Sequence, residues 1–306
     1  MGSRGILEFG GQITNPANFP WFATVFSHPV GGGNPNLCGG VVISETMVLT
    51  AAHCVASAET LSVYAGGSNG WWPDTGSFSS ESFWTSPMYD AGATDSGAWD
   101  TGVLITDSPM NIPTRPIMDL AGAYWGALRD GALLQSIGHG LWCSTGKPSC
   151  VSRALRITTI PKVSTARCLG NASDQWPLQI VGDAICAGFE GTPNAPQPCQ
   201  GDSGGPLLVA NIVYGLVSRG DASNGCGNSI RPVIFAPIAT NSDFIMGAMN
   251  ISTPPPPSPP LEPPPVPPAP VAENTARSFT YQKSSAVRFR ASVVSLLLYM
   301  AATCRL

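Results

Sequence analysis

Glycine and proline divide the first 250 residues of the chain into short apolar runs, and this division restricts the fold more than any other feature. The clearest runs lie at 40–50, 101–106 and 206–217. They are rich in β-branched residues and end at Gly, Pro, Asn or Asp, which is typical of short β-strands. Only residues 238–250 follow a helical period, with Thr240 or Asn241 as the expected N-cap. The pattern therefore predicts an all-β sandwich or barrel with one terminal helix.

The composition changes after the helical segment. From Pro254 to Pro270 the chain is mostly proline, which fixes φ and cannot donate to a β-ladder, so an extended polyproline II linker is predicted. Residues 271–306 begin polar and basic and end in an apolar run, which is shorter than the roughly 20 residues of a spanning helix. The linker is read either as a cell-wall attachment or as a plain spacer. The tail is read as a lipid-anchor signal, a membrane-associated tail or a segment without function.

The cysteine content indicates a secreted or cell-surface protein, and the charge argues against a nucleic-acid partner. Nine cysteines and only 11% charged residues are typical of a secreted or cell-surface protein stabilised by disulfides. The opening residues, MGSRGILEFGG, lack the apolar core of a signal peptide. Either the sequence begins after its signal or export is not encoded in it. The net charge of −4, without a dense basic cluster, predicts no nucleic-acid partner.

Three strings carry the residue types of nucleophilic acyl transfer: LTAAHC (49–54), AWDTGVLI (98–105) and QGDSGGP (200–206). A serine hydroxyl is a weak nucleophile, so it needs an imidazole to take its proton and a buried carboxylate to orient that imidazole. His53, Asp100 and Ser203 supply these three groups. Their order, His, Asp, Ser, excludes the α/β-hydrolase esterases, in which the serine comes first.

These strings closely resemble those of the trypsin-like (chymotrypsin-fold) serine peptidases, and the similarity covers residues 8–250. The resemblance implies two packed six-stranded antiparallel β-barrels with a short C-terminal helix and the catalytic triad between the barrels. It implies that the backbone N–H groups of Gly201 and Ser203 form an oxyanion hole. A peptidase of this kind would act as a monomer on protein or peptide substrates and would meet proteinaceous inhibitors.

The resemblance also implies a set of disulfides: Cys38–Cys54, Cys168–Cys186 and Cys199–Cys226. A further local bridge, Cys143–Cys150, is predicted across a short loop. Cys304 is left over in the tail.

Specificity is inferred from positions that match the substrate pocket of the family. Gln197, six residues before the nucleophile, stands at the base of that pocket, so strong selection for Arg or Lys is not expected. Val233 replaces a glycine of the relatives with deep pockets and would narrow the pocket opposite Gly220. We therefore predict an elastase- or chymotrypsin-like preference for uncharged residues. Ser218 and Arg219 are also expected to contact the substrate.

Activation is where the sequence departs from the family. Relatives are made as zymogens, and the amino group freed by cleavage pairs with the aspartate before the nucleophile, here Asp202. The aligned tetrad is 8–11, which begins with Glu and follows Leu7 rather than Arg or Lys. A buried Glu without a partner would be costly. Either the cut falls after Arg4 or Gly5, or activation differs from that of the family.

These inferences divide the chain into four parts: a propeptide remnant (1–7), the peptidase domain (8–250), a Pro-rich linker (251–270) and a C-terminal tail (271–306). An alternative is an inactive or zymogen-like homologue on the same fold that serves as a binding or adhesion module. The complete triad favours the enzyme. The three histidines are far apart and the cysteines can pair, so neither a metal site nor a cofactor is predicted.

Overall fold

A computed structural model describes residues 11–66, 76–91, 96–112, 115–123, 128–142, 150–168, 184–189, 192, 195–220 and 232–250. The chain divides into two units, 1–255 and 256–306, and every described residue belongs to the first. The Pro-rich linker and the tail predicted from the sequence lie outside the described residues. None of the helices in the described part has the length and apolarity needed to cross a membrane.

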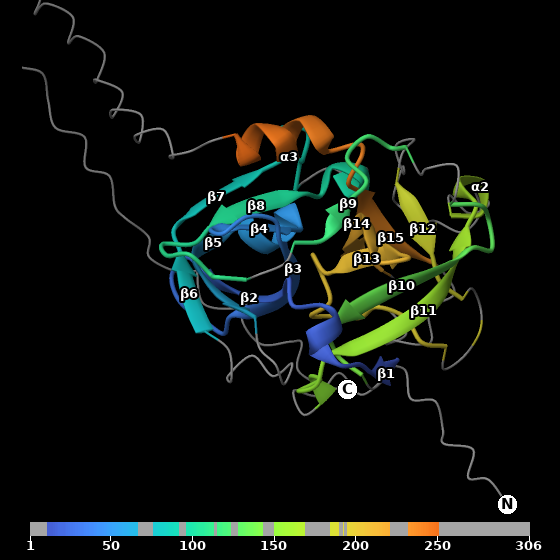
Figure 1. The fold of residues 1–306 in the computed structure, drawn as a ribbon, viewed down its shortest axis with the longest axis horizontal. Helices are drawn as coiled ribbons and strands as arrows, with labels where there is room; N and C mark the ends of the chain where they lie inside the picture. The colour runs from blue at the N-terminus through green and yellow to red at the C-terminus, as the bar shows by residue number, and fades with distance from the viewer. Residues whose placement is uncertain are drawn as a thin grey trace, which may run out of the picture. The chain divides into compact units, whose positions relative to one another are not determined.

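The first barrel is built from seven assigned strands in the order β6-β5-β2-β3-β4-β8-β7. Their bounds are β2 Phe22–Pro29, β3 Asn36–Val42, β4 Met47–Thr50, β5 Ala58–Ala65, β6 Gly76–Ser80, β7 Ser82–Thr85 and β8 Gly102–Ile105. All their pairings are antiparallel. Only Glu81 separates β6, which pairs with β5, from β7, which pairs with β8. β6 and β7 therefore act as one bent strand that closes a six-stranded barrel, as predicted (Figure 1).

The second barrel closes through a pairing between β11 and β12. Its strands are β10 Leu133–Gly138, β11 Arg156–Val163, β12 Ile185–Ala187, β13 Pro206–Val209, β14 Ile212–Arg219 and β15 Val233–Pro237. These six strands form an antiparallel ring, β11-β10-β13-β14-β15-β12. Two short strands are added at its margins: β1 Gln12–Ile13 pairs with β11, and β9 Ile117–Met118 runs parallel to β14. The predicted fold class is confirmed (Figure 1).

The apolar runs of the sequence form strands that turn where small or polar residues interrupt them. The run at 40–50 ends β3 and forms β4, with a turn in which the Ser44 hydroxyl accepts from the amide of Met47 (3.1 Å). The run at 206–217 folds into the β13–β14 hairpin across Ala210 and Asn211, with φ of +47° and +63°. Two residues with positive φ give the twist that a tight hairpin requires. The small and polar residues that interrupt the apolar runs therefore account for the shortness of the strands.

Helices are few and short. They are α1 Ala52–Val55, α2 Thr165–Cys168 and α3 Ser242–Met249, with 3₁₀ turns η1 at Pro16–Asn18 and η3 at Ser96–Trp99. α3 confirms the predicted terminal helix and buries Ile245 and Ala248 in the larger hydrophobic core. Asn241 is the N-cap residue, as predicted, but its side chain makes no cap hydrogen bond and donates to the carbonyls of Ala98 (2.8 Å) and Pro237 (2.9 Å). Its Oδ1, the atom that would accept a cap hydrogen bond, has no hydrogen-bond partner among the described residues.

The disulfides follow the expected pairing as far as the structure describes it. Cys38 is bonded to Cys54, and Cys168 is bonded to Cys186. Cys150 and Cys199 are also disulfide-bonded. Their expected partners, Cys143 and Cys226, lie outside the described residues, and so does Cys304 in the tail. The Cys38–Cys54 bond ties α1 to β3 in the first barrel.

Candidate active site

A histidine and a buried carboxylate meet where the two barrels face each other. His53 lies on α1, and its Nδ1 is 2.7 Å from Oδ2 of Asp100, whose exposed fraction is only 1%. The backbone amide of His53 donates to the other carboxylate oxygen at 2.9 Å. The Ser218 hydroxyl, at the end of β14, donates to Oδ2 at 2.7 Å. Because Asp100 is held by three donors, it fixes the orientation of the imidazole and leaves Nε2 free to act as a base.

Ser203 lies in a tight loop that both barrels hold. Its carbonyl accepts the amide of Gly39, in β3 of the first barrel, at 2.7 Å. The next amide, of Gly204, donates to the carbonyl of Val217 in β14 of the second barrel, also at 2.7 Å. The Ser203 carbonyl is also 3.8 Å from Sγ of Cys54, the residue after His53. These contacts place the serine backbone beside α1.

The structure thus gathers the three predicted catalytic residues from α1, from the turn between η3 and β8, and from the 199–206 loop. In the part of the chain that is described, the Ser203 hydroxyl makes no hydrogen bond to the His53 ring. Nucleophile–base contacts are often long in a ligand-free enzyme and shorten when substrate binds. The pairing of His53 with the Asp100 carboxylate is already formed without a substrate.

Glycines allow the close approach of the loop to the first barrel. Gly204 has φ of +76°, and a Cβ there would lie 2.6 Å from the carbonyl oxygen of Gly39 and 2.7 Å from the amide of Ala51. Gly201 has φ of +96°, and a Cβ there would lie 3.1 Å from Cα of Gly140. Side chains at these positions would push the nucleophile loop away from His53, which explains the glycines on both sides of the serine.

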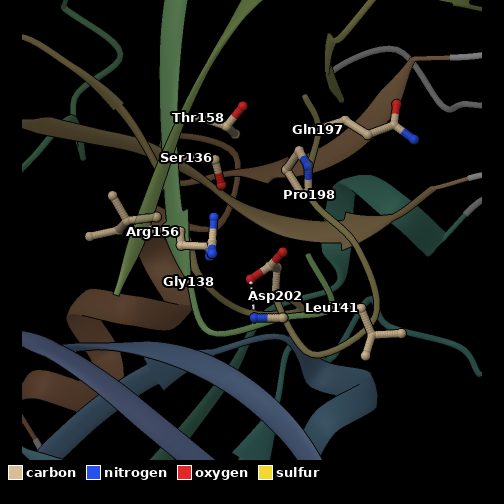
Figure 2. A pocket seen from close by; sticks show the side chains of 10 residues that line it. Ser136, Gly138, Leu141, Arg156, Thr158, Gln197, Pro198 and Asp202 are labelled. Atoms are coloured by element: carbon tan, nitrogen blue, oxygen red, sulfur yellow. Dashed lines mark hydrogen bonds between the residues drawn. The ribbon is translucent and has the colours of Figure 1, made fainter. Parts of the chain in front are cut away.

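The side chain of Asp202, the residue before Ser203, points into a cavity (Figure 2). Its carboxylate is buried and accepts the amides of Gly140 (2.7 Å) and Cys199 (2.9 Å). The cavity is lined by Ser136, Ile137, Gly138, Gly140, Leu141, Arg156, Thr158, Gln197, Pro198 and Asp202. Burial raises the pKa of Asp202 to about 6, against the lowering effect of the two amides. Asp202 forms no ion pair with any residue that the structure describes, and the expected N-terminal tetrad lies largely outside those residues.

His139 lies between two of the cavity glycines and is buried. Its Nδ1 donates to the carbonyl of Ser152 at 3.0 Å, and its ring packs at a tilt on Phe22 with centroids 5.7 Å apart. Burial lowers the pKa of His139 to about 4. It is therefore neutral at physiological pH and holds the loop that carries Gly140.

Positions predicted to contact the substrate fall in two places. Gln197 is buried at 6% exposure and lines the cavity of Asp202. Val233 begins β15 and is 2% exposed, and its Cγ2 would lie 3.5 Å from a Cβ built on Gly220. The Val233 side chain thus lies opposite Gly220, and its role in a substrate pocket stays a prediction.

A tyrosine beside the triad was not anticipated from the sequence. Burial and the charge of Asp100 raise the pKa of the Tyr89 hydroxyl, and the charge of Arg219 opposes that shift. The Arg219 Nε would lie 3.9 Å from a Cβ built on Gly97. Tyr89 sits in a loop without a recognisable motif, so only the fold shows that it lies near the catalytic carboxylate.

One cluster of potential metal ligands lies in the described part of the chain. It consists of Cys38, His53 and Cys54, whose ligand atoms lie within 4.8 Å of one another. Because the two sulfurs are bonded to each other, they are not available as thiolates, which are the form that binds metal. This cluster therefore is not a metal site.

Comparisons with known proteins find the trypsin family model, several trypsins and the structure of a collagenase. The family model for trypsin matches residues 8–245. Trypsin 5G1 of Aedes aegypti is 29% identical over 252 residues, covering 78% of this chain and 85% of that protein. Trypsin zeta of Drosophila erecta is 32% identical over 238 residues, covering 75% and 81%. A solved structure of HL collagenase superposes with a TM-score of 0.62 at 23% identity, over 79% of this chain and 99% of that one.

Proposed function

Since the chain belongs to the trypsin family of serine endopeptidases, we propose that it hydrolyses peptide bonds of proteins or peptides with Ser203 as nucleophile, His53 as general base and Asp100 as orienting carboxylate. The observation that carries this assignment is the 2.7 Å contact between His53 Nδ1 and the buried Asp100. A buried carboxylate bonded to Nδ1 stabilises the imidazolium that forms during proton transfer.

The proposed reaction has two halves. In the first, the Ser203 oxygen bonds to the substrate carbonyl carbon, His53 Nε2 takes the hydroxyl proton, and that proton passes to the leaving amine as the C–N bond breaks. In the second, a water molecule attacks the acyl-enzyme with His53 again as base, and the serine is regenerated. We assign the oxyanion hole to the N–H groups of Gly201 and Ser203, because a left-handed Gly201 lets neighbouring amides face one point.

For specificity we propose small or medium uncharged residues before the scissile bond. Two features support it: the uncharged Gln197 at the position of the pocket base, and the Val233 side chain opposite Gly220. Position 197 supplies no carboxylate for a lysine or arginine side chain, and burying such a charge without a partner is costly. The competing hypothesis is selection for Arg or Lys, as the trypsins among the relatives suggest.

We further propose that the protein is a secreted zymogen whose 251–270 segment is a linker to the tail. Two disulfides in the described residues suit an oxidising compartment. The buried Asp202, without a cationic partner among the described residues, suits a precursor that awaits an amino group. Pairing with an ammonium would favour the ionised carboxylate and would stabilise the loop that carries Ser203.

The test of the reaction is labelling with a fluorophosphonate probe of the full-length protein and of the Ser203→Ala variant. We expect the wild type to label and the variant to remain unlabelled, and sequencing of the labelled species identifies the amino terminus that serves Asp202. The catalytic assignment is wrong if the labelled residue, read by mass spectrometry, is not Ser203, or if neither intact nor trimmed protein labels.

The test of specificity is hydrolysis of a peptide series that differs only at the residue before the scissile bond. Wild type should favour Ala, Val or Leu, and Val233→Gly should shift the preference towards Phe and Tyr by about tenfold in kcat/KM, since one or two methylene groups in a pocket are worth 1–3 kcal/mol. Preferential cleavage after Arg or Lys by the wild type would establish the competing hypothesis.

A further inference from the structure

Arg156, at the start of β11, is held on three sides. Its Nε donates to the Ser152 hydroxyl at 2.8 Å, and its Nη1 donates to the carbonyl of Gly11 at 3.0 Å. Its guanidinium carbon lies 5.1 Å from the centroid of the Trp142 ring, which is a cation–π distance. This many contacts on one arginine indicate a fixed side chain rather than a solvated charge.

Gly11 is held as tightly as the arginine that it meets. It has φ of +64°, and a Cβ there would overlap the carbonyl of Ile157. Immediately after it, Gln12 and Ile13 pair with Ile157 and Arg156 in β1–β11. The chain therefore has one fixed point at Gly11, against the strand that carries Arg156.

The same arginine lines the cavity into which Asp202 points (Figure 2). The cavity volume is about 20 Å³, which is enough for one water-sized group such as an ammonium. Asp202 is continuous with Ser203 and bonded to Gly140, so whatever pairs with its carboxylate acts on the nucleophile loop. The arginine that binds the Gly11 carbonyl therefore also lines the cavity of the buried carboxylate.

We propose that Arg156 is a positioning residue for activation: it fixes the chain at Gly11, so that an amino group freed a few residues earlier is directed to Asp202 and orders the Ser203 loop. Each extended residue spans at most about 3.6 Å, so the three residues before Gly11 cover roughly 10 Å. Without the anchor this segment could adopt many more conformations, and each insertion would cost more conformational entropy. The proposal rests on the proposed peptidase function.

The test compares Arg156→Met, Arg156→Lys and the matched control Arg129→Met, an exposed arginine on another loop. After processing, we expect Arg156→Met to label with the fluorophosphonate about tenfold more slowly, because hydrogen bonds from a charged group are lost. Arg156→Lys should recover part of the rate, and Arg129→Met should label like wild type. Wild-type labelling by Arg156→Met overturns the proposal.

A second readout does not depend on catalysis. In the Ser203→Ala background, hydrogen exchange should speed up in Arg156→Met at residues 12–14 and also at the Gly140 amide that binds Asp202. The β10 amides at 133–135 should stay protected, which separates positioning from general loosening of the sheet. Faster exchange at 12–14 with an unchanged Gly140 amide refutes the coupling to Asp202, whether or not the enzyme proves active.

Discussion

At the scale of single residues, the buried carboxylate of Asp100 accepts hydrogen bonds from other groups besides the His53 ring. Oδ2 of Asp100 accepts from both His53 Nδ1 and the Ser218 hydroxyl, each at 2.7 Å, while Oδ1 accepts the His53 amide. Burying a carboxylate to 1% exposure is costly unless such bonds replace water. The Ser218 hydroxyl therefore helps to position the carboxylate that holds the His53 ring.

Removing that hydroxyl should slow the chemical step. For Ser218→Ala we expect kcat to fall about tenfold with little change in KM, because a hydrogen bond to a charged group contributes about 1.5–3 kcal/mol. Steady-state kinetics on one peptide substrate measures the split. The matched control is Ser62→Ala, which removes a hydroxyl that contacts His28 in the first barrel at 3.0 Å and should leave kcat unchanged.

His139 should make the fold sensitive to acid. Its pKa is lowered by burial to about 4 from an ordinary 6.5, so between pH 6.5 and pH 4 the unfolded chain binds a proton that the folded chain does not. The free energy of unfolding must then fall as pH decreases through this window, by about 3 kcal/mol from this group. Urea unfolding at pH 7.5, 5.5 and 4 should show a shallower decline for His139→Gln than for wild type.

The matched control for that titration is His28→Gln, on β2 of the first barrel. Both variants replace a histidine by glutamine, so the effect of the substitution itself is common to them. A His139→Gln curve that runs parallel to wild type would contradict the buried, neutral state of this ring.

At the scale of elements, the loop that carries Ser203 (199–206) approaches β3 and β4 very closely. The loop is bonded to Gly39 on one barrel and Val217 on the other. Thr50, at the end of β4, donates its hydroxyl to the Gly39 carbonyl at 2.8 Å and faces Gly204. The strands of the two barrels thus clamp a loop that has room only for glycine at this point.

A pair of glycine substitutions separates backbone strain from crowding. Gly204 and Gly131 both have positive φ, +76° and +80°, but a Cβ on Gly131 would meet nothing within 4 Å. Gly131→Ala should cost about 1–2 kcal/mol of unfolding free energy, the left-handed strain alone. Gly204→Ala should cost more than about 4 kcal/mol and abolish labelling. Equal losses in urea unfolding would show that crowding at the loop is relieved by small shifts.

At the scale of the whole molecule, the two closed barrels carry the site and belong to one unit. That unit ends at Pro255, where the proline-rich sequence begins. Domain boundaries fall where few contacts cross and where the composition turns to proline and polar residues. The barrels should therefore fold without the rest of the chain.

A chain that ends after Pro255 tests this boundary. It should unfold within about 2 °C of the full-length Tm, because a 1 kcal/mol change shifts Tm by 2–4 °C in domains of this size. Its rate of fluorophosphonate labelling should equal that of the full-length protein. A lower Tm or slower labelling would mean that 256–306 supports the barrels or the site.

The sequence by itself determined the strand-rich fold class and the identity of the catalytic candidates. Short β-branched runs are local patterns that depend on neighbours along the chain, whereas the His–Asp–Ser assignment and the cysteine pairs follow from the resemblance of their strings to those of the trypsin-like family. The glycines around Ser203 belong to the same group, since the motif that contains them is continuous.

Only the tertiary structure decided the contacts between distant segments. The Arg156–Gly11 bond spans 145 positions, the Tyr89 hydroxyl lies near Asp100 only because a loop folds back, and Asn241 donates its side-chain amide to the carbonyl of the distant Ala98. No periodicity encodes such pairs. They arise when antiparallel pairing closes each barrel, since closure fixes which loops face each other, and burial then sets the pKa values of Asp202 and His139.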